Sequence, residues 1–431
     1  MDNFLPSDLL SRLEEIGEAE IVVGIPSYNN ARTIGHVVRA VSAGLTKYFP
    51  DQKAVVVNSD GGSKDGTREA VLGAEIDTDA LLQISHPVHP IQRISTPYHG
   101  IPGKGSAFRT IFAVARRTKA KACVVVDADL RSIAPHWIEL LAKPVLERDF
   151  DFIAPYYLRH KYDGTITNGI IYPMTRALFG KRVRQPIGGD FGLSGRLVAR
   201  YLEKDVWETD VARFGVDIWM TLTAIAESFR VGQSYLGAKL HDAKDPGADL
   251  SSMFRQVVGS VFALMETYEP VWEKTNGSEP VPMFGFPFDV GVEPIGVNIE
   301  RMIQAYCQGV KDLHEIYQGF LAPETLVALG AVARQPHESF HLPAGLWAHV
   351  VYEFAAAWHD RALDREHLLQ SLVPLYLGRT ASFVIEVRES NALEVEERIE
   401  QLCNIFESEK PYLVQRWNAP AGKENTHAKS G

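Results

Sequence analysis

The sequence predicts an α/β protein with a mostly parallel sheet, followed by a helical region. From residue 20 to about residue 147, short apolar runs alternate with segments whose apolar residues follow helical spacing. From about residue 298 to residue 408, long amphipathic helical patterns follow one another. Alternating strands and helices are typical of parallel sheets, which bind ligands at the carboxyl ends of their strands.

The elements are predicted in this order. Strand-like runs occupy residues 20–28, 54–57, 122–126, 152–157 and 231–240, and helical patterns occupy residues 34–45, the segment from residue 67, and residues 104–117, 135–147, 166–179 and 216–229. We divide the chain into an N-terminal extension (1–18), an α/β domain (19–265), a connector rich in Pro and Gly (266–297), a C-terminal helical region (298–418) and a disordered tail (419–431).

Composition narrows the class of protein. The 431 residues are 45% hydrophobic, which is enough for a sizeable core in two domains. The net charge of −10 argues against nucleic acid or an anionic membrane as a partner. The cysteines Cys123, Cys307 and Cys403 are too scattered for a disulfide framework or a zinc site. With no leader-like start and no uncharged apolar window of 18 residues, we expect a cytoplasmic protein without a membrane span.

Two carboxylates follow the buried strand at residues 122–126. Asp127 and Asp129 would repel each other unless a cation is bound, although they could also cap the helix that begins near Pro135. Mg²⁺ or Mn²⁺ prefers such oxygen ligands together with diphosphate oxygens. His241, which follows the strand at 231–240, could complete the shell, although a surface histidine is the default interpretation.

A turn at residues 102–105 precedes one of the predicted helices. Gly103 and Gly105 permit close approach of the backbone to an anion, and Lys104 adds a point charge that suits a diphosphate leaving group. The alternative is a solvated turn lysine. The pattern of a P-loop is absent from the sequence.

Four further positions are candidates for binding or catalysis, and each also has a structural explanation. Asp60 either stabilises a turn or accepts from a nucleobase, and Gly188-Gly189 is either a loop or a close approach to a sugar. Arg159 offers a fork for a carboxylate, with an exposed ion pair as the alternative. Asp217 lies in an apolar helix start, where a carboxylate needs a partner or a task.

These motifs occur in a particular order, and the chain resembles GT-A nucleotide-sugar glycosyltransferases over about residues 20–260. The resemblance is nearest to the retaining mannosylglycerate and glucosylglycerate synthases and more distant to the glucosyl-3-phosphoglycerate synthases. The residues that carry it are Pro26, Ser27, Tyr28, Asn29, Asp60, the turn at 102–105, Asp127, Ala128, Asp129, Gly188, Gly189, Asp190 and His241.

The resemblance implies roles for these residues. Asp129 and His241, with Asp127 close by, would hold Mg²⁺ or Mn²⁺, and Lys104 would contact the diphosphate. Asp217 matches an acid near the acceptor hydroxyl. The donor would be bound by Pro26, Ser27, Tyr28, Asn29, Asp60, Gly103, Lys104, Asp127, Ala128, Gly189 and Asp190, and the acceptor by Arg159, Asp163, Thr167, Ile187, Gly188 and Asp217.

The chain also departs from the mannosyl enzymes. Its first strand ends in Pro26-Ser27-Tyr28-Asn29 in place of a more basic turn, and the Asp60 loop is closer to general family 2 enzymes and the glucosyl-phosphoglycerate group. The nucleobase and the hexose therefore stay open. A phosphorylated acceptor would demand extra basic groups, for which the candidates are His160, Lys161, Lys181 and Arg182.

We expect a retaining hexosyltransferase that moves glucose from a nucleoside diphosphate sugar to the 2-hydroxyl of D-glycerate, giving glucosylglycerate, a compatible solute. The alternatives are mannosylglycerate synthase with GDP-mannose and glucosyl-3-phosphoglycerate synthase. An inverting reaction with Asp217 as general base also stays open. Rivals of another class are a sugar nucleotidyltransferase and a silent nucleotide-sugar binder. Apolar stripes in the helical region, such as Leu346, Val350 and Phe354, would form a homo-oligomer or cover the acceptor site.

Overall fold

The chain forms two compact units, each assembled from separate segments of the sequence. A computed structural model describes residues 4–74, 91–98, 101–240, 251–287 and 295–419. Unit 1 consists of residues 1–163, 181–244 and 279–295, and unit 2 of residues 164–180, 245–278 and 296–431. The domains predicted above follow one another along the chain. The two units are instead made of alternating segments, and the chain passes between them five times.

Unit 1 is built on a mostly parallel sheet, which confirms the predicted fold class. Among the described residues its strand order is β10-β8-β5-β7-β4-β1-β2-β3. Neighbouring strands are parallel except at β7, which is antiparallel to both β4 and β5. The strands are β1 (Ile21–Ser27), β2 (Ala54–Asp60), β3 (Gln92–Pro97), β4 (Ala122–Val125), β5 (Phe152–Leu158), β7 (Phe191–Ser194), β8 (Val231–Ala238) and β10 (Met283–Phe284), and a separate parallel pair is formed by β6 (Lys181–Arg182) and β9 (Glu279–Pro280).

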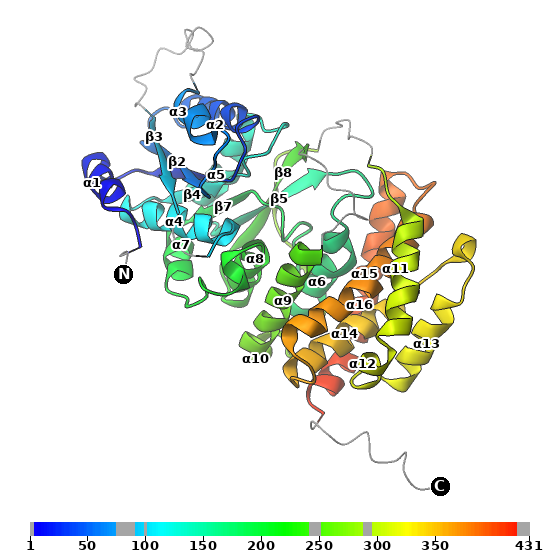
Figure 1. Cartoon of the computed structure of the whole chain (residues 1–431). Helices are drawn as coiled ribbons and strands as arrows, with labels where there is room; N and C mark the ends of the chain where they lie inside the picture. The colour runs from blue at the N-terminus through cyan, green and yellow to red at the C-terminus, as the bar shows by residue number, and fades with distance from the viewer. Residues whose placement is uncertain (1–3, 75–90, 99–100, 241–250, 288–294, 420–431) are drawn as a thin grey trace, which may run out of the picture. The chain divides into compact units, whose positions relative to one another are not determined.

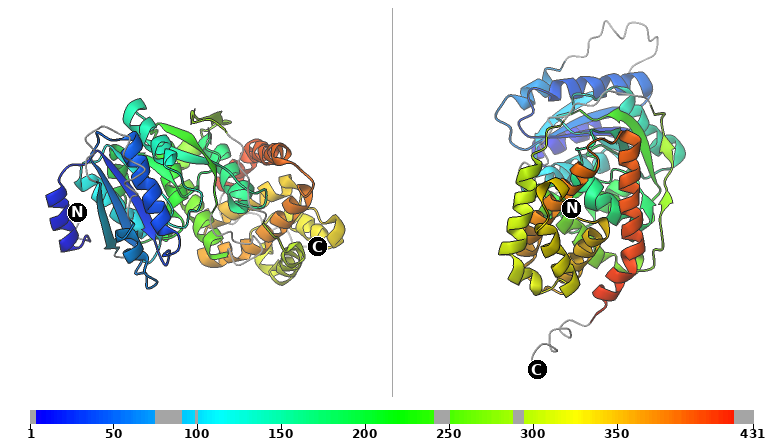
Figure 2. Two further views of the ribbon diagram at one scale, coloured as in Figure 1. Left: turned by 90° about the horizontal axis from the view of Figure 1, so that it is seen from above. Right: turned by 90° about the vertical axis from the view of Figure 1, so that its right-hand side faces the viewer.

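Helices cover both faces of this sheet (Figures 1 and 2). Alternate residues of β1 divide between the faces: Val23 joins the core that α2 and α5 complete, whereas a side chain on Gly24 would collide with Ile111 of α4. The helical elements of unit 1 are α1 (Ser7–Ile16), α2 (Ile34–Tyr48), α3 (Thr67–Leu72), α4 (Lys104–Arg117), α5 (His136–Arg148), α7 (Gly195–Leu202), the 3₁₀ turn η3 (Asp210–Ala212) and α8 (Val216–Ala226).

Three strands of the sheet lay outside the predictions, namely β3, β7 and the two-residue β10. β3 is a polar segment that ends in a proline, and β7 has four residues, one of them Gly192. Neither reads as a buried strand in sequence. Gly192 is required there because a side chain would meet the backbone of Leu141 in α5 at 2.0 Å.

Unit 2 is entirely helical within the described residues. Its elements are the π turn η2 (Thr167–Ile171), α6 (Tyr172–Phe179), α9 (Ser251–Thr267), α10 (Glu269–Trp272), α11 (Ile299–Asp312), α12 (His314–Gln318), α13 (Pro323–Ala333), the 3₁₀ turn η4 (His337–Ser339), α14 (Ala344–His359), α15 (Arg365–Glu386) and α16 (Ala392–Trp417). The helical pattern predicted at residues 166–179 is therefore a π turn that continues into α6. Val350 and Phe354 of α14 are fully buried inside this unit, so the apolar stripe has its partners there.

The charge of Arg176 is buried in the core of unit 2. Its side chain is 1% exposed and comes from α6. The guanidinium donates to Glu407 at 2.8 Å and Asn404 at 3.0 Å, and it pairs with Glu400, so all three partners lie on α16. A buried guanidinium needs such partners for its donors. This network ties α6 to the last helix of the chain.

Helix α15 is the one described helix long and apolar enough to cross a membrane. In the structure 72% of its apolar window is buried, as in the core helix of a folded unit. Its partners include α9, α11 and α14 of the same unit.

Candidate active site

Polar residues gather at the carboxyl edge of the sheet in unit 1. Asp60 is the last residue of β2, Asp127 follows β4, and Lys239 directly follows β8. Asp190 directly precedes β7, and because β7 runs antiparallel, its beginning lies at the same edge as the ends of its neighbours. The sheet thus collects groups from four strands at one edge.

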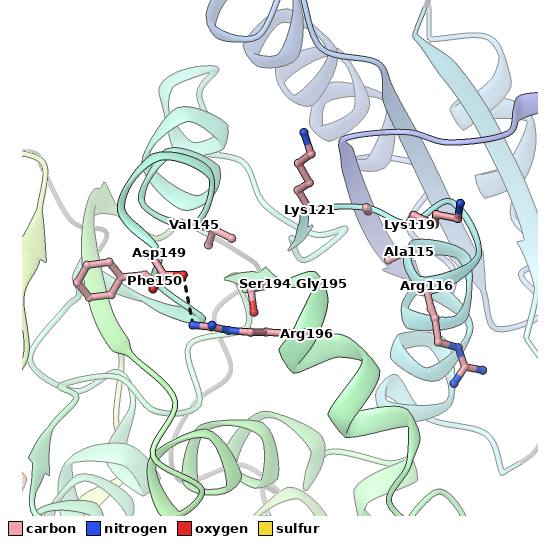
Figure 3. Close-up of a pocket in the computed structure, with 11 residues that line it drawn as sticks. Ala115, Arg116, Lys119, Lys121, Val145, Asp149, Phe150, Ser194, Gly195 and Arg196 are labelled. Atoms are coloured by element: carbon pink, nitrogen blue, oxygen red, sulfur yellow. Dashed lines mark ion pairs between the residues drawn. The ribbon is translucent and has the colours of Figure 1, made fainter.

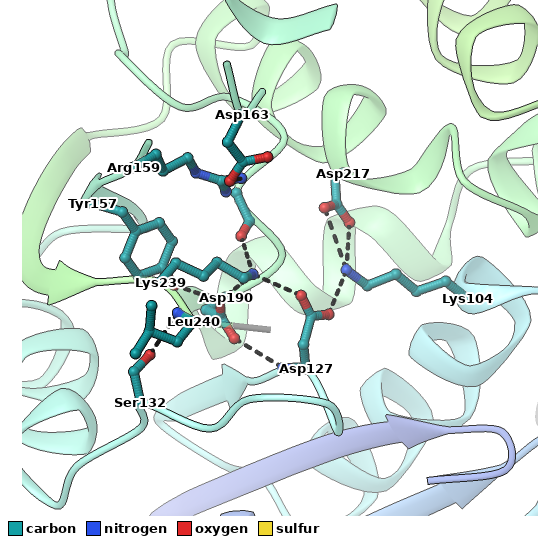
Figure 4. A network of polar contacts seen from close by, with 11 residues as sticks. Lys104, Asp127, Ser132, Tyr157, Arg159, Asp163, Asp190, Asp217, Lys239 and Leu240 are labelled. Carbon is teal, nitrogen blue, oxygen red and sulfur yellow. Dashed lines mark hydrogen bonds and ion pairs between the residues drawn. The ribbon is translucent and has the colours of Figure 1, made fainter. Parts of the chain in front are cut away.

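Asp127 is the centre of a network of five charged groups (Figure 4). Its Oδ1 lies 2.8 Å from Nζ of Lys104, and its Oδ2 lies 2.8 Å from Nζ of Lys239. Burial alone would raise the pKa of Asp127, but the two ammonium groups outweigh burial and hold the pKa well below its ordinary value. Asp127 is therefore ionised and held from two sides.

Lys104 begins helix α4 and reaches two carboxylates. Besides Asp127 it contacts both oxygens of Asp217 at 3.3 Å. Burial lowers its pKa, but the attraction of Asp127 and then of Asp217 raises it above the ordinary lysine value. The ammonium is therefore charged, as the predicted contact with a diphosphate requires.

The glycines that flank Lys104 pack against the segment of η3, and their approach to an anion stays a prediction. A side chain on Gly103 would lie 2.5 Å from the carbonyl oxygen of Ala212, and one on Gly105 would lie 1.8 Å from that of Val211. The amide of Gly103 donates to the hydroxyl of Tyr98, and that of Gly105 donates to the carbonyl of Arg213. These glycines are needed because the segment of η3 packs directly against them, which sequence spacing cannot reveal.

Asp217 occupies the first turn of α8 and is nearly buried. The residue is 7% exposed, and within the part of the chain that the structure describes, its Oδ1 has no hydrogen-bond partner apart from the ion pair with Lys104. Burial raises the pKa of Asp217, and the attraction of Lys104 offsets this only in part. A carboxylate with a raised pKa is suited to accept a proton.

Lys239 is the site residue that sequence reasoning missed. Its Nζ donates to Asp127 Oδ2 at 2.8 Å, to the carbonyl of Gly188 at 2.8 Å and to Asp190 Oδ2 at 2.9 Å. Burial lowers its pKa, but Asp127 and Asp190 raise it above the ordinary value. The available signal was its position after a buried apolar strand, which is the criterion that identified Asp127.

Asp190 is buried and contacts both Asp127 and Lys239 of this network. It has no exposed surface, and its Oδ1 accepts the amide of Asp127 at 2.8 Å. Its Oδ2 accepts from the hydroxyl of Tyr157 as well as from Lys239. Burial and the charge of Asp190 hold the pKa of Tyr157 well above its ordinary value, so the phenol stays a donor. A direct contact of Asp190 with the donor sugar stays a prediction.

Five of the residues predicted to bind the donor, Pro26, Ser27, Tyr28, Asn29 and Asp60, lie at the ends of β1 and β2. Asp60 is 1% exposed, and its Oδ2 accepts the amides of Gly62 and Ser63 at 3.0 and 2.9 Å. Its Oδ1 accepts from the hydroxyl of Ser27 at 3.1 Å. The turn-stabilising role of Asp60 is thus present, and its contact with a nucleobase stays a prediction.

The turn after β1 is held by this second loop. Asn29 has a left-handed φ of 54° and receives support from Ser63, whose hydroxyl accepts its amide at 2.8 Å. Tyr28 is 63% exposed beside Gly61, which places an open aromatic ring at this edge. Pro26 is part of β1 opposite Ser59, and the carbonyl of Ala128 accepts from the hydroxyl of Thr33 at 2.7 Å.

The predicted acceptor residues are divided between the units. Arg159 donates from Nη1 to Asp163 at 3.2 Å and lies 5.5 Å from the ring centre of Tyr157, all in unit 1 (Figure 4). Its buried Nε has no hydrogen-bond partner among the described residues. Ile187 is half-buried in the loop before Gly188. Thr167 begins η2 in unit 2, so its meeting with Arg159 stays a prediction.

The predicted metal ligands are partly described. Among the described residues there is no group of three His, Cys, Asp or Glu that could hold a metal ion, and His241 lies outside them. The segment after Asp129 is nevertheless held against the end of β8, because Leu240 accepts from the amide of Arg131 at 2.9 Å and donates to the hydroxyl of Ser132 at 2.9 Å. Carboxylate oxygens at this edge fit a hard cation such as Mg²⁺ or Mn²⁺.

A hollow of about 410 Å³ lies at the opposite, amino-terminal edge of the sheet (Figure 3). Ser194, which lines it, pairs with Ala122 at the start of β4. Its cations do not converge, since Lys121, Lys119 and Arg116 point in different directions. This hollow is separate from the candidate active site.

Comparison with known proteins finds similarity to solved structures. No family model and no curated protein matches the sequence. Glucosyl-3-phosphoglycerate synthase from Mycobacterium tuberculosis with Mn²⁺, UDP and glucosyl-3-phosphoglycerate is 22% identical, with 62% of this chain and 86% of that chain covered and a TM-score of 0.43. The same enzyme with Mn²⁺, UDP-glucose and phosphoglyceric acid is 22% identical, with 60% and 84% covered and a TM-score of 0.42. These values are too low to assign a family.

Proposed function

We propose that the chain is a nucleoside diphosphate sugar-dependent hexosyltransferase that moves glucose to the 2-hydroxyl of D-glycerate. The observation that carries the proposal is the position of Lys104, whose ammonium lies between the carboxylates of Asp127 and Asp217. A charged and positioned lysine can stabilise the negative charge that develops on a departing diphosphate.

Each of these residues has a part in the reaction. The bond between the sugar and the diphosphate breaks, and the acceptor hydroxyl forms the new bond to the sugar. Lys104 stabilises the negative charge of the departing diphosphate, for which its ammonium is already charged and positioned. Asp217 orients the acceptor hydroxyl and accepts its proton, since its carboxylate is nearly buried and its pKa is raised.

A divalent cation completes the proposed site. Asp129 and His241, with Asp127, are the residues that we propose hold it. When bound, Mg²⁺ or Mn²⁺ neutralises the phosphates of the donor. The hydrogen bonds of Leu240 to Arg131 and Ser132 support this assignment, since they hold the segment after Asp129 to the strand end before His241.

An anionic acceptor is supported by Arg159. Its Nη1 contacts Asp163, and its buried Nε has no hydrogen-bond partner among the residues that the structure describes, so the guanidinium retains donors for a carboxylate. Of the basic residues that a phosphorylated acceptor would require, Lys181 is engaged in an ion pair with Glu279. We therefore place D-glycerate ahead of 3-phosphoglycerate. Retention of configuration, a cytoplasmic location and a homo-oligomer stay predictions.

A panel of donors and acceptors tests the proposal. The purified chain is incubated with Mn²⁺ and UDP-, GDP- or ADP-glucose, or GDP-mannose, each with D-glycerate or 3-phosphoglycerate, and nucleotide release is measured. We expect release with a glucose donor that depends on D-glycerate. Release of pyrophosphate from a sugar 1-phosphate and a nucleoside triphosphate would instead identify a nucleotidyltransferase, and donor binding without turnover would identify a silent binder.

The product reports the stereochemistry. NMR of the anomeric proton distinguishes an α-linkage, which we expect, from a β-linkage, which would contradict the retaining assignment. The same spectrum identifies the glycerate oxygen that carries the sugar.

A further inference from the structure

Lys239 uses all the hydrogen-bonding capacity of its ammonium on the protein. An ammonium group has three N–H donors. Those of Lys239 are engaged by Asp127, Gly188 and Asp190 at 2.8, 2.8 and 2.9 Å, and the side chain is 5% exposed. While these bonds persist, Lys239 has no donor left for a substrate phosphate.

The three acceptors belong to two segments of unit 1. Asp127 follows β4, Gly188 belongs to the loop before β7, and Asp190 lies at the end of that loop. Lys239 itself follows β8, which is separated from β4 in the sheet by β5 and β7. One side chain therefore joins the end of β8 to the end of β4 and to the loop before β7.

The loop before β7 rests directly on the ion pair between Lys239 and Asp127. A side chain built on Gly189 would lie 2.1 Å from Asp127 Oδ2 and 2.8 Å from Lys239 Nζ. Gly189 also has a φ of +90°, which favours glycine. The opposite side of the loop is held by Thr221, whose hydroxyl donates to the carbonyl of Pro186 at 2.6 Å. The position of this loop thus depends on the ion pair beneath it.

The second lysine of the network is held differently. Lys104 has one contact at 2.8 Å, to Asp127, and two longer ones at 3.3 Å, to Asp217. Its side chain is 16% exposed, against 5% for Lys239. Long contacts are weaker than short ones, so Lys104 can exchange a carboxylate for a phosphate more easily than Lys239 can.

We infer that Lys239 is a positioning residue of the donor site, which fixes the carboxylate of Asp127 and the loop at residues 187–190 in the arrangement that receives the sugar. This inference rests on the proposed function, because it assigns the supported residues to the donor. Misplacement of reacting groups by about 1 Å can lower a rate about 100-fold. Loss of Lys239 therefore lowers kcat more than it changes KM for the acceptor.

The test compares Lys239→Met and the charge-balanced double variant Lys239→Met with Asp190→Asn. The double variant removes one cation and one anion. Because no unpaired charge is added, it serves as a folded alternative if the single variant is unstable. Lys204→Met is the matched control, because Lys204 also pairs with a carboxylate, that of Glu227, at the far end of α8. Hydrogen exchange of amides 187–190, kcat and KM for D-glycerate, and calorimetric binding of Mn²⁺ with UDP, GDP or ADP are measured.

We expect folded Lys239 variants with faster exchange at residues 187–190, kcat lowered about 100-fold and acceptor KM within about 3-fold of the wild type. We expect Lys204→Met to match the wild type in all three. Unchanged loop exchange and kcat in a folded variant would overturn the inference, and so would failure of both variants to fold, which would make Lys239 a residue of the core. A wild type that binds none of the nucleotides and releases none would instead overturn the proposed function.

Discussion

The ammonium of Lys104 lies 3.3 Å from both carboxylate oxygens of Asp217, although the two residues are 113 positions apart in the chain. One begins α4, and the other lies in the first turn of α8. Their side chains are 16% and 10% exposed, so each is partly shielded from water and affects the charge of the other. Variants of this pair are therefore the most direct probes of the site.

Asp217→Asn should lower turnover and raise stability at neutral pH. Because burial raises the folded-state pKa of Asp217, the folded protein favours the neutral carboxyl group. Its contribution to stability is full below the unfolded-state pKa and is lost as pH rises through the folded-state pKa. Asparagine stays neutral throughout. The melting temperature of the variant relative to wild type should therefore increase between pH 4 and pH 8.

The same variant should lose about 10²- to 10⁴-fold in kcat, since it cannot accept a proton. Initial rates with saturating donor measure this loss. Wild-type turnover in Asp217→Asn would exclude the proposed role, and a lower melting temperature at pH 8 would contradict the assigned charge balance.

Lys104→Met should reduce kcat by about 10²- to 10³-fold, because the departing diphosphate loses a preorganised cation. Loss of Lys104 should also raise the pKa of Asp217 further, since Lys104 no longer lowers it. Single-turnover rates and a pH profile of kcat measure both effects. If the variant changes only the donor KM, Lys104 contributes to ground-state binding and has no special role in the transition state.

Gly189→Ala should disrupt the donor site. The added methyl group would meet Asp127 Oδ2 at 2.1 Å, and the positive φ adds about 1–2 kcal/mol of backbone strain. Gly17→Ala is the matched control, because Gly17 has a φ of +68° with no atom within 4 Å of the added group. Thermal melts and donor binding should show a larger loss for Gly189→Ala, whereas equal losses would mean that the contact with Asp127 is unimportant.

Chelation should abolish turnover, and Mn²⁺ or Mg²⁺ should restore it. Metal with nucleotide at about 100 times its Kd should stabilise the folded protein by about 2.7 kcal/mol. Asp129→Asn should weaken this effect, which melting curves detect without reference to activity. Full activity in the presence of EDTA would remove the metal from the proposed mechanism.

Arg176→Met should destabilise unit 2 by about 3–5 kcal/mol, because it leaves the carboxylates of Glu400 and Glu407 without their buried partner. Arg200→Met is the control, since Arg200 is 42% exposed and pairs with Glu203 and Glu227 near the surface. Urea denaturation should show a clear loss for the first and a curve near wild type for the second. Equal midpoints would contradict the importance of the buried network.

Much of the sheet is predictable because several of its strands are continuous apolar runs in the sequence. The runs at 20–28, 54–57 and 122–126 become β1, β2 and β4, and Asp127 takes its place because residues after buried strands share an edge. Asp190 could not be placed in the same way. Its position depends on the antiparallel direction of β7, and four residues with a central glycine carry no signal of direction.

Contacts made by lysines and glycines were harder to predict than strands. Lys239 follows a strand, but an isolated lysine usually reads as solvated, and only the fold brings three acceptors to its ammonium. The glycines beside Lys104 suggested an anion, whereas their neighbour is the backbone of η3, far along the chain. Long-range packing, unlike periodicity, leaves no local pattern.

The five crossings of the chain between the two units limit how this protein can be cut or recombined. A stop codon after α15 would delete α16, which carries Glu400, Asn404 and Glu407. Arg176, more than 200 positions upstream, would then keep a buried charge without these partners. Such a fragment would be a substrate for cellular quality control, and the α/β unit cannot be excised as one continuous piece. Domain exchange or truncation must therefore keep all the segments of both units together.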